Sequence, residues 1–182
     1  MFDRSGSRKY LNSSERKAFL IASKEEPTIE RRAFCLSLFY TGSRISEALN
    51  VTVGRADLRV GEIVFETLKQ RRRGEFRSVP IPKTLVNLIL KLQKRADPSA
   101  RIWNFSRSTA YRMVKDCMMR AGINGGMASP KGLRHGFAVA CLTHKIPLPT
   151  VKKWLGHARL ETTAIYLDVS GDEERELASR LW

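Results

Sequence analysis

Two segments of this chain, residues 60–67 and 76–81, are rich in β-branched and aromatic residues, as β-strands usually are. The polar run at 69–75, KQRRRGE, lies between them and is typical of the tip of a hairpin. Elsewhere the apolar residues recur mainly at helical spacing. We therefore expect a mainly α fold with a small antiparallel β-sheet (α+β).

Helix signals recur along the rest of the chain. Asn12, followed three residues later by Glu15, resembles a capping box and opens a helix that runs through about Ala22. Apolar spacing, glycines and prolines indicate further helical segments, at 28–40, 44–50, 85–92, 110–121, 130–145 and 149–155. No internal repeat or low-complexity linker divides them. A length of 182 residues suits one well-buried domain, or one domain with a small appendage.

Composition excludes several classes of protein. Hydrophobic residues make up 42% of the chain, yet no stretch approaches the roughly 18 consecutive apolar residues of a membrane span. The N-terminus, MFDRSG, lacks the apolar run of a secretory signal. Cys35, Cys117 and Cys141 are odd in number and form no CxxC pair, which indicates neither a disulfide framework nor a zinc site. We expect a cytoplasmic protein with a reduced interior, no membrane partner, no cofactor and no metal.

The formal net charge of +15 is unevenly distributed. Residues 101–160 contain 11 Lys or Arg and a single acid, Asp116, whereas the last 22 residues contain six acids and two arginines. A long stretch with almost no acid is what a binding site for a polyanion would contain. The alternative is a solvated basic face with no partner.

Two motifs in the last third of the chain carry the chemistry. Residues 130–138 read PKGLRHGFA, and residues 154–157 read WLGH, with Tyr166 nine positions beyond the histidine. A third motif, TGSRISEAL at 41–49, supplies another arginine far upstream. A guanidinium group matches the oxygens of a phosphate, and a tyrosine hydroxyl needs neighbours that stabilise its anion or the transition state. Together these groups suit attack of a phenol on a phosphodiester.

At these residues the chain resembles the tyrosine recombinase (phage integrase) family. The resemblance covers most of residues 10–170, in the family's order of arginine box, hairpin lysine, HxxR-like segment, LGH segment and tyrosine. It implies the catalytic-domain fold over 11–170, between an N-terminal tail at 1–10 and a helical tail at 171–182. It also implies a site-specific DNA recombinase or integrase, which cleaves and rejoins strands through a 3′-phosphotyrosine, without metal or ATP.

The resemblance gives catalytic roles to particular residues. Tyr166 would be the nucleophile. Arg44 and Arg134 would clamp the non-bridging oxygens of the phosphate, and His157 would donate a hydrogen bond to one of them. Lys69, at the hairpin tip, matches the lysine that protonates the departing 5′ oxygen.

Four arginines of the hairpin are predicted to bind DNA. Arg71, Arg72 and Arg73 follow Lys69, and one of them could make the contact attributed to that lysine. As a plain charge run they would grip backbone phosphates. Arg77, which follows them on the second predicted strand, completes the set.

Lys131 departs from the family pattern, because a histidine usually lies three residues before the second arginine. An ammonium group does not accept a proton, so Lys131 would keep a phosphate contact and lose the role of base. His135 is a candidate substitute, but adjacent residues on a helix point about 100° apart. We therefore expect His135 to serve helix packing.

Double-stranded DNA is the expected partner, bound by a homo-oligomer, a tetramer in the family, with accessory proteins in some systems. Such a protein would be associated with the nucleoid. The tail at 171–182 reads as an amphipathic helix whose apolar residues are Leu177, Leu181 and Trp182. It would dock on the next protomer in trans or fold back on its own domain. Residues 1–10 leave no room for the family's N-terminal domain, as expected of a single-domain member or an excised fragment.

Two other functions remain open. Rejoining of the original strands would relax supercoils, as in the related type IB topoisomerases. Lys131 also admits a DNA-binding regulator that has kept the fold and lost the chemistry.

Overall fold

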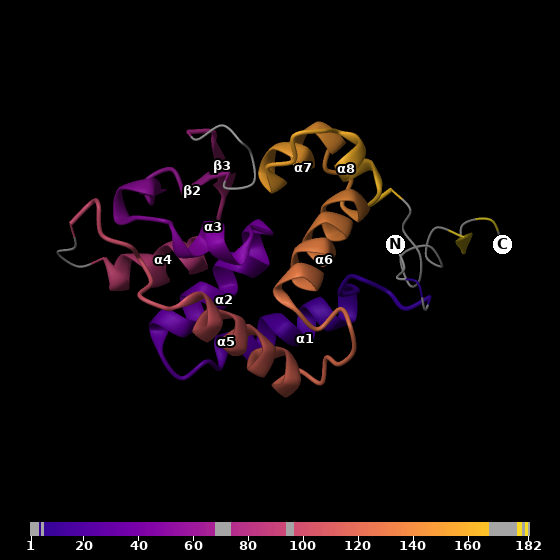
Figure 1. The fold of residues 1–182 in the computed structure, drawn as a ribbon, viewed down its shortest axis with the longest axis horizontal. Helices are drawn as coiled ribbons and strands as arrows, with labels where there is room; N and C mark the ends of the chain where they lie inside the picture. The colour runs from indigo at the N-terminus through magenta and orange to yellow at the C-terminus, as the bar shows by residue number, and fades with distance from the viewer. Residues whose placement is uncertain are drawn as a thin grey trace.

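The computed structural model describes residues 4, 6–67, 74–93, 97–167, 178, 179 and 181 (Figure 1). Its helices and strands follow one another as α1 (Ser13–Lys24), α2 (Ile29–Thr41), α3 (Ile45–Leu49), a 3₁₀ turn η1 (Val53–Arg55), β1 (Ala56–Asp57), β2 (Glu62–Glu66), β3 (Phe76–Pro80), α4 (Lys83–Leu92), α5 (Arg107–Arg120), α6 (Pro130–Thr143), α7 (Leu148–Leu155) and α8 (Glu161–Ala164). The predicted fold class, mainly α with a small antiparallel sheet, is confirmed.

The sheet has three strands in the order β1-β2-β3, and both pairings are antiparallel. Strands β2 and β3 form the predicted hairpin, in the register that pairs Ile63 with Val79 and Phe65 with Arg77. Ile63, Phe65 and Val79 point to the core, which fixes this register. The sequence did not predict β1, because a strand of two residues carries no alternation to detect.

The helix boundaries lie within a few residues of those predicted. At the start of α1, the side chain of Asn12 accepts a hydrogen bond from the backbone N–H of Glu15, and the Glu15 carboxylate accepts one from the backbone N–H of Asn12. This is the capping box that the sequence predicted. The predicted tail helix lies outside the described residues, apart from 178, 179 and the exposed Leu181.

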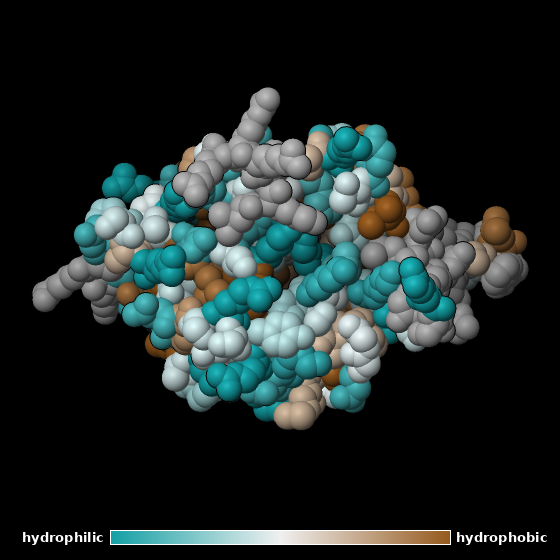
Figure 2. Space-filling view, viewed as in Figure 1, coloured by the Kyte–Doolittle hydropathy of each residue, from teal (hydrophilic) through white to brown (hydrophobic). Residues whose placement is uncertain are grey.

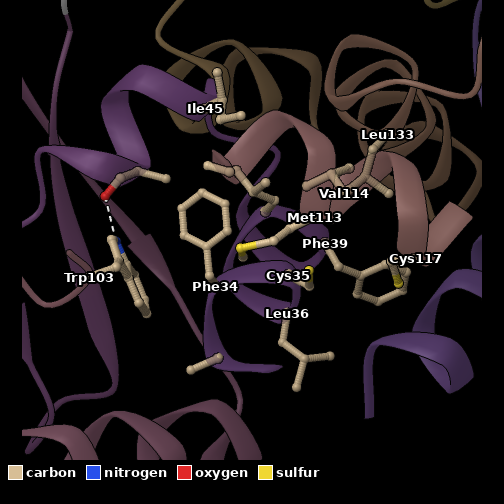
Figure 3. Packing of buried hydrophobic residues seen from close by; sticks show 14 of the residues in the cluster. Phe34, Cys35, Leu36, Phe39, Ile45, Trp103, Met113, Val114, Cys117 and Leu133 are labelled. Carbon is tan, nitrogen blue, oxygen red and sulfur yellow. Dashed lines mark hydrogen bonds between the residues drawn. The ribbon is translucent and has the colours of Figure 1, made fainter. Parts of the chain in front are cut away.

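Helix α2 lies at the centre of the larger hydrophobic core, where Phe34 meets the indole of Trp103 edge to face (Figure 3). The indole N–H of Trp103 donates a hydrogen bond to the carbonyl of Ala48 at 2.7 Å, drawn as a dashed line in Figure 3. Ala48 belongs to α3, the helix that begins directly after Arg44. The packing of the core therefore fixes the position of α3, and with it the position of Arg44, the first candidate arginine.

A second hydrophobic cluster joins the C-terminal half of α6 to α7 and to the segment after α8. Phe137, Val151, Leu155 and Tyr166 are buried in it. Figure 1 shows α6 running beside the α2–α5 part of the molecule, with α7 and α8 across one of its ends. Because Leu133 of α6 belongs to the larger core, this helix anchors the second cluster to the first.

All three cysteines are buried and free, as expected of residues that fill space in the interior. None of the helices in the described part of the chain has the length and apolar character needed to cross a membrane.

Candidate active site

A pocket of about 750 Å³ opens between α3, the start of α5, α6 and the α7–α8 region. It is lined by Arg44, Ile45, Ser46, Glu47, Arg107, Tyr111, Gly126, Ser129, Pro130, Lys131, Arg134, His135, His157, Thr162, Ile165 and Tyr166. Figure 2, which shares the viewpoint of Figure 1, shows hydrophilic side chains over much of the face in view, with smaller apolar patches between them. Five of the six predicted catalytic residues therefore line one basin, although they come from segments up to 122 positions apart in the sequence.

Arg44 is positioned by a buried carboxylate. It is the N-cap residue of α3, and Glu47 in the first turn accepts hydrogen bonds from its backbone N–H at 3.0 Å and from Nη1 at 2.7 Å. Glu47 is only 1% exposed. Burial alone would raise the pKa of Glu47, but Arg77 and the hydrogen bond from Arg44 hold it below its ordinary value. Glu47 is thus a fixed negative charge that orients the guanidinium of Arg44.

Arg77 does not have the surface position that a DNA contact would require. Its side chain is 4% exposed, and all three guanidinium nitrogens donate inward: Nε to the carbonyl of Trp154, Nη1 to Thr67 and Nη2 to Glu47. The structure contradicts direct binding of DNA by Arg77. The alternation of β3 puts Arg77 on the same face as Val79, but the sequence could not show that Glu47 meets it there. Arg77 instead links Glu47 to the end of α7.

Helix α7 ends at Gly156, whose φ of 63° lies in the left-handed region that favours glycine. The backbone N–H of His157 then donates back to the carbonyl of Lys152 at 3.2 Å. This tight ending of the helix brings the His157 ring into the pocket, which explains why a glycine precedes that histidine.

Arg134 reaches the pocket from the first half of α6, and Ser129 caps that helix by accepting a hydrogen bond from Gly132. Nη1 of Arg134 donates to the carbonyl of Gly42 at 2.8 Å, and Nη2 of Arg134 donates to the carbonyl of Leu155 at 2.6 Å. Burial first, and the nearby Arg44 second, lower the pKa of Arg134 to about 10. The group stays cationic near neutral pH, and it is fixed by two backbone carbonyls that carry no net charge.

His157 and Tyr166 lie side by side. Their rings are nearly parallel, with an interplanar angle of 12° and centroids 6.2 Å apart. Nδ1 of His157 is 2.9 Å from the hydroxyl of Thr163, and the backbone N–H of Tyr166 donates to the carbonyl of the same Thr163. Burial first, then Arg134 and Arg44, lower the pKa of His157 to about 3, so the ring is neutral near neutral pH. Thr163 therefore contacts both residues, His157 through its hydroxyl and Tyr166 through its backbone carbonyl.

Tyr166 is 1% exposed, and its hydroxyl lies 2.8 Å from Nδ1 of His135. Burial raises the pKa of Tyr166, although Arg134 and Arg44 partly oppose that shift. The prediction that His135 serves helix packing did not include this contact with Tyr166. Arg134 and His135 do point in different directions from α6, as predicted, but Tyr166 lies on the side that His135 faces.

Lys131 is exposed at the first turn of α6 and lines the same pocket. Lys69, Arg71, Arg72 and Arg73 lie outside the described residues. Arg107 and Tyr111, from the first turns of α5, also line the pocket and were not among the predicted site residues. Their only signal in the sequence was membership of the stretch at 101–160 that is nearly free of acids.

One cluster in the described part of the chain has side chains suited to a metal. Glu26, Cys35 and Cys117 are buried with their ligand atoms within 4.8 Å of one another. Both carboxylate oxygens of Glu26 already accept hydrogen bonds from guanidinium groups, those of Arg31 and Arg120. The cluster lies in the larger core and contributes no residue to the pocket.

Comparison with known proteins identifies relatives of this sequence and fold. The model of the phage integrase family matches residues 9–173. Tyrosine recombinase XerA of Pyrococcus furiosus is 32% identical over 162 residues, which cover 84% of this chain and 54% of the relative. A crystal structure of XerA recombinase superposes with a TM-score of 0.80 at 27% identity, over 94% of this chain and 64% of that one.

A structure of the XerH site-specific recombinase, bound to its difH substrate in a pre-cleavage complex, has the same fold. Its TM-score is 0.76 at 21% identity, over 98% of this chain and 59% of that one. The chain therefore spans between half and two thirds of the length of these relatives.

Proposed function

The chain belongs to the phage integrase family, and from that premise we propose that it cleaves and rejoins DNA strands at specific sites through a covalent phosphotyrosine. One observation carries the proposal: the phenol of Tyr166 shares a pocket with Arg44, Arg134 and His157. A phenol can attack the phosphorus of a phosphodiester, and two fixed guanidinium groups can bind the phosphate oxygens during that attack. The XerH relative is a site-specific recombinase bound to its difH substrate, and the Tn1549 transposon integrase, of similar fold, is in complex with DNA; both support DNA as the ligand.

In the proposed reaction, the hydroxyl oxygen of Tyr166 attacks the scissile phosphorus, and the 5′ oxygen of the next nucleotide leaves. The new phosphotyrosine bond retains the energy of the broken linkage, so rejoining needs no ATP. Arg44 and Arg134 bind the non-bridging oxygens and stabilise the charge that develops on them. Loss of one such preorganised contact typically costs about 100- to 1000-fold in rate.

Other groups have supporting roles. His157 donates a hydrogen bond to a phosphate oxygen through the ring nitrogen that Thr163 does not hold. Lys131 adds a positive charge at the pocket, and Lys69 supplies the proton for the leaving 5′ oxygen.

The assembly also belongs to the proposal. We expect a catalytic domain over 11–170 that works as a homo-oligomer on DNA, with the tail at 171–182 docked on a neighbouring protomer. Removal of 171–182 should abolish cooperative assembly and spare cleavage at a single site. Loss of folding in that variant would instead support a tail that packs on its own domain.

Covalent capture tests the function and selects the target sequence in the same experiment. A library of nicked duplexes with randomised arms traps the cleaved strand, because the short fragment beyond the scissile phosphate dissociates. The wild type should enrich related sequences as protein–DNA adducts that survive denaturation, and Tyr166→Phe should enrich none. Adducts without sequence preference would favour relaxation of supercoils, and binding without any adduct would favour a regulator.

A further inference from the structure

We propose that His135 is the proton acceptor for Tyr166, in the role that Lys131 cannot take. This assignment rests on the proposed function, and it goes beyond that function by naming the base. The geometry is direct: Nδ1 of His135 lies 2.8 Å from the hydroxyl oxygen of Tyr166, with ring centroids 5.5 Å apart. That separation is a normal length for a hydrogen bond with a hydroxyl donor, and a general base must be within this reach of the proton it takes.

The surroundings of His135 keep its ring neutral in the free protein. Burial first, then the charges of Lys131, Arg134 and Lys9, lower the pKa of His135 to about 4. A neutral ring that carries its hydrogen on Nε2 has a lone pair on Nδ1, so the phenol donates and the ring accepts. When a phosphodiester enters the pocket, its negative charge offsets those cations and makes a protonated His135 easier to form.

Neither neighbour is placed for the same task. Lys131 has an ammonium group, which offers three donors and no lone pair. The ring of His157 lies nearly parallel to that of Tyr166, and its Nδ1 is engaged with Thr163. Within the described residues, His135 is the basic group that shares a hydrogen bond with the phenol.

Bonds, electrons and protons balance in the proposed step. The bond from the Tyr166 oxygen to phosphorus forms while the bond from phosphorus to the 5′ oxygen breaks, and the electron pair goes to that oxygen. The phenolic proton ends on Nδ1 of His135, and the leaving oxygen takes its proton from a separate cationic donor, for which we propose Lys69. In rejoining, protonated His135 returns its proton to the departing phenolate.

The test compares adduct formation by the wild type, His135→Ala and His135→Gln on a nicked duplex selected by covalent capture with the wild type. We expect the His135 variants to form adduct about 100- to 10,000-fold more slowly, the usual range for loss of a general base. His144→Gln is the matched control, because His144 caps the other end of α6 on the exposed surface. That variant should retain the wild-type rate.

A more acidic nucleophile separates a base from a merely structural histidine. A fluorinated tyrosine at position 166 ionises more readily and needs a base less, so it should restore at least tenfold of the rate lost in His135→Ala. If His135→Gln cleaves within threefold of the wild type, or if the fluorinated nucleophile gives no recovery, His135 is not the base. If the wild type forms no adduct that depends on Tyr166, the proposed function itself fails and takes this assignment with it.

A measurement on the wild type covers the case in which the His135 variants do not fold. With ¹⁵N-labelled histidine, Nδ1 of His135 should resonate as an unprotonated nitrogen, and its shift should change in Tyr166→Phe. A protonated Nδ1 near neutral pH would overturn the assignment.

Discussion

Gly156 leaves open the space that the guanidinium of Arg77 occupies: a Cβ at position 156 would lie 2.8 Å from Nη1 of Arg77. That guanidinium is held in place by hydrogen bonds to Glu47, Thr67 and the carbonyl of Trp154. The glycine of the LGH motif therefore has two functions. It ends α7 in a left-handed conformation. Its missing side chain also leaves space for Arg77, which donates a hydrogen bond to Glu47, the carboxylate that orients Arg44.

Gly156→Ala tests both functions. The left-handed backbone should cost about 1 to 2 kcal/mol, and the collision with Arg77 about 1 to 3 kcal/mol more, as in an overpacked core. Gly122→Ala isolates the first effect, because Gly122 has a φ of 69° and nothing within 4 Å of the added Cβ. Urea denaturation should show the larger loss of unfolding free energy for Gly156→Ala. Equal losses in the two variants would contradict the role of the contact with Arg77.

Glu47→Gln removes the negative charge between two arginines and leaves their guanidinium groups in place. The buried Arg77 then lacks a counter-charge, so we expect a loss of about 3 kcal/mol of unfolding free energy, as when one partner of a buried pair is removed. Adduct formation should also fall, because Arg44 loses the carboxylate that orients it. Glu66→Gln is the control: its pair with Arg55 is partly exposed, and its removal should cost less than about 1 kcal/mol. Similar losses for both variants would argue against a special role of Glu47.

The two histidines beside Tyr166 predict a pH dependence of stability. In the unfolded chain they take up protons near pH 6.5, whereas in the folded protein the pKa of His135 is about 4 and that of His157 about 3. The unfolded state therefore binds more protons below pH 6.5, and the unfolding free energy should fall as the pH is lowered.

Urea titrations between pH 6.5 and 5 measure this effect before most carboxylates begin to titrate. His135→Gln and His157→Gln should each reduce the slope, and the double variant should reduce it most. A stability that is independent of pH over this range, or that increases on acidification, would contradict the neutral state of both rings.

Arg134→Lys keeps the positive charge and loses the planar fork. A lysine cannot donate at once to the carbonyls of Gly42 and Leu155 in the fork geometry seen here. We expect adduct formation to fall about 100- to 1000-fold, while DNA affinity at fixed salt changes less than threefold. Arg59→Lys, on the exposed surface, should change neither quantity. A cleavage rate near that of the wild type in Arg134→Lys would show that charge alone suffices at this position.

The sequence predicted those parts of the molecule that have local signals. The capping box at Asn12 and Glu15, the hairpin around the basic run and the helix over 149–155 all depend on neighbours a few residues away. The grouping of Arg44, Arg134, His157 and Tyr166 came from the family resemblance, because their convergence depends on the packing of α3, α6 and α7.

The contacts of two side chains could not be predicted from the local sequence. Arg77 looked like another cation of the hairpin, but its burial depends on the carboxylate of Glu47, which lies 30 positions away. His135 looked misdirected relative to Arg134, and only the position of Tyr166 in three dimensions shows what it faces. Side-chain direction on a helix is predictable, whereas the identity of the group it meets across the fold is not.

The most direct measurement of the proposed chemistry is mass spectrometry of the peptide that remains attached to DNA after covalent capture and proteolysis. We predict that the peptide containing Tyr166 carries the added mass of a nucleotide 3′-phosphate, joined through the tyrosine oxygen, and that Tyr166→Phe yields no such peptide. Attachment at any other residue, or the absence of an adduct with every duplex in the library, would contradict a phosphotyrosine mechanism in this protein.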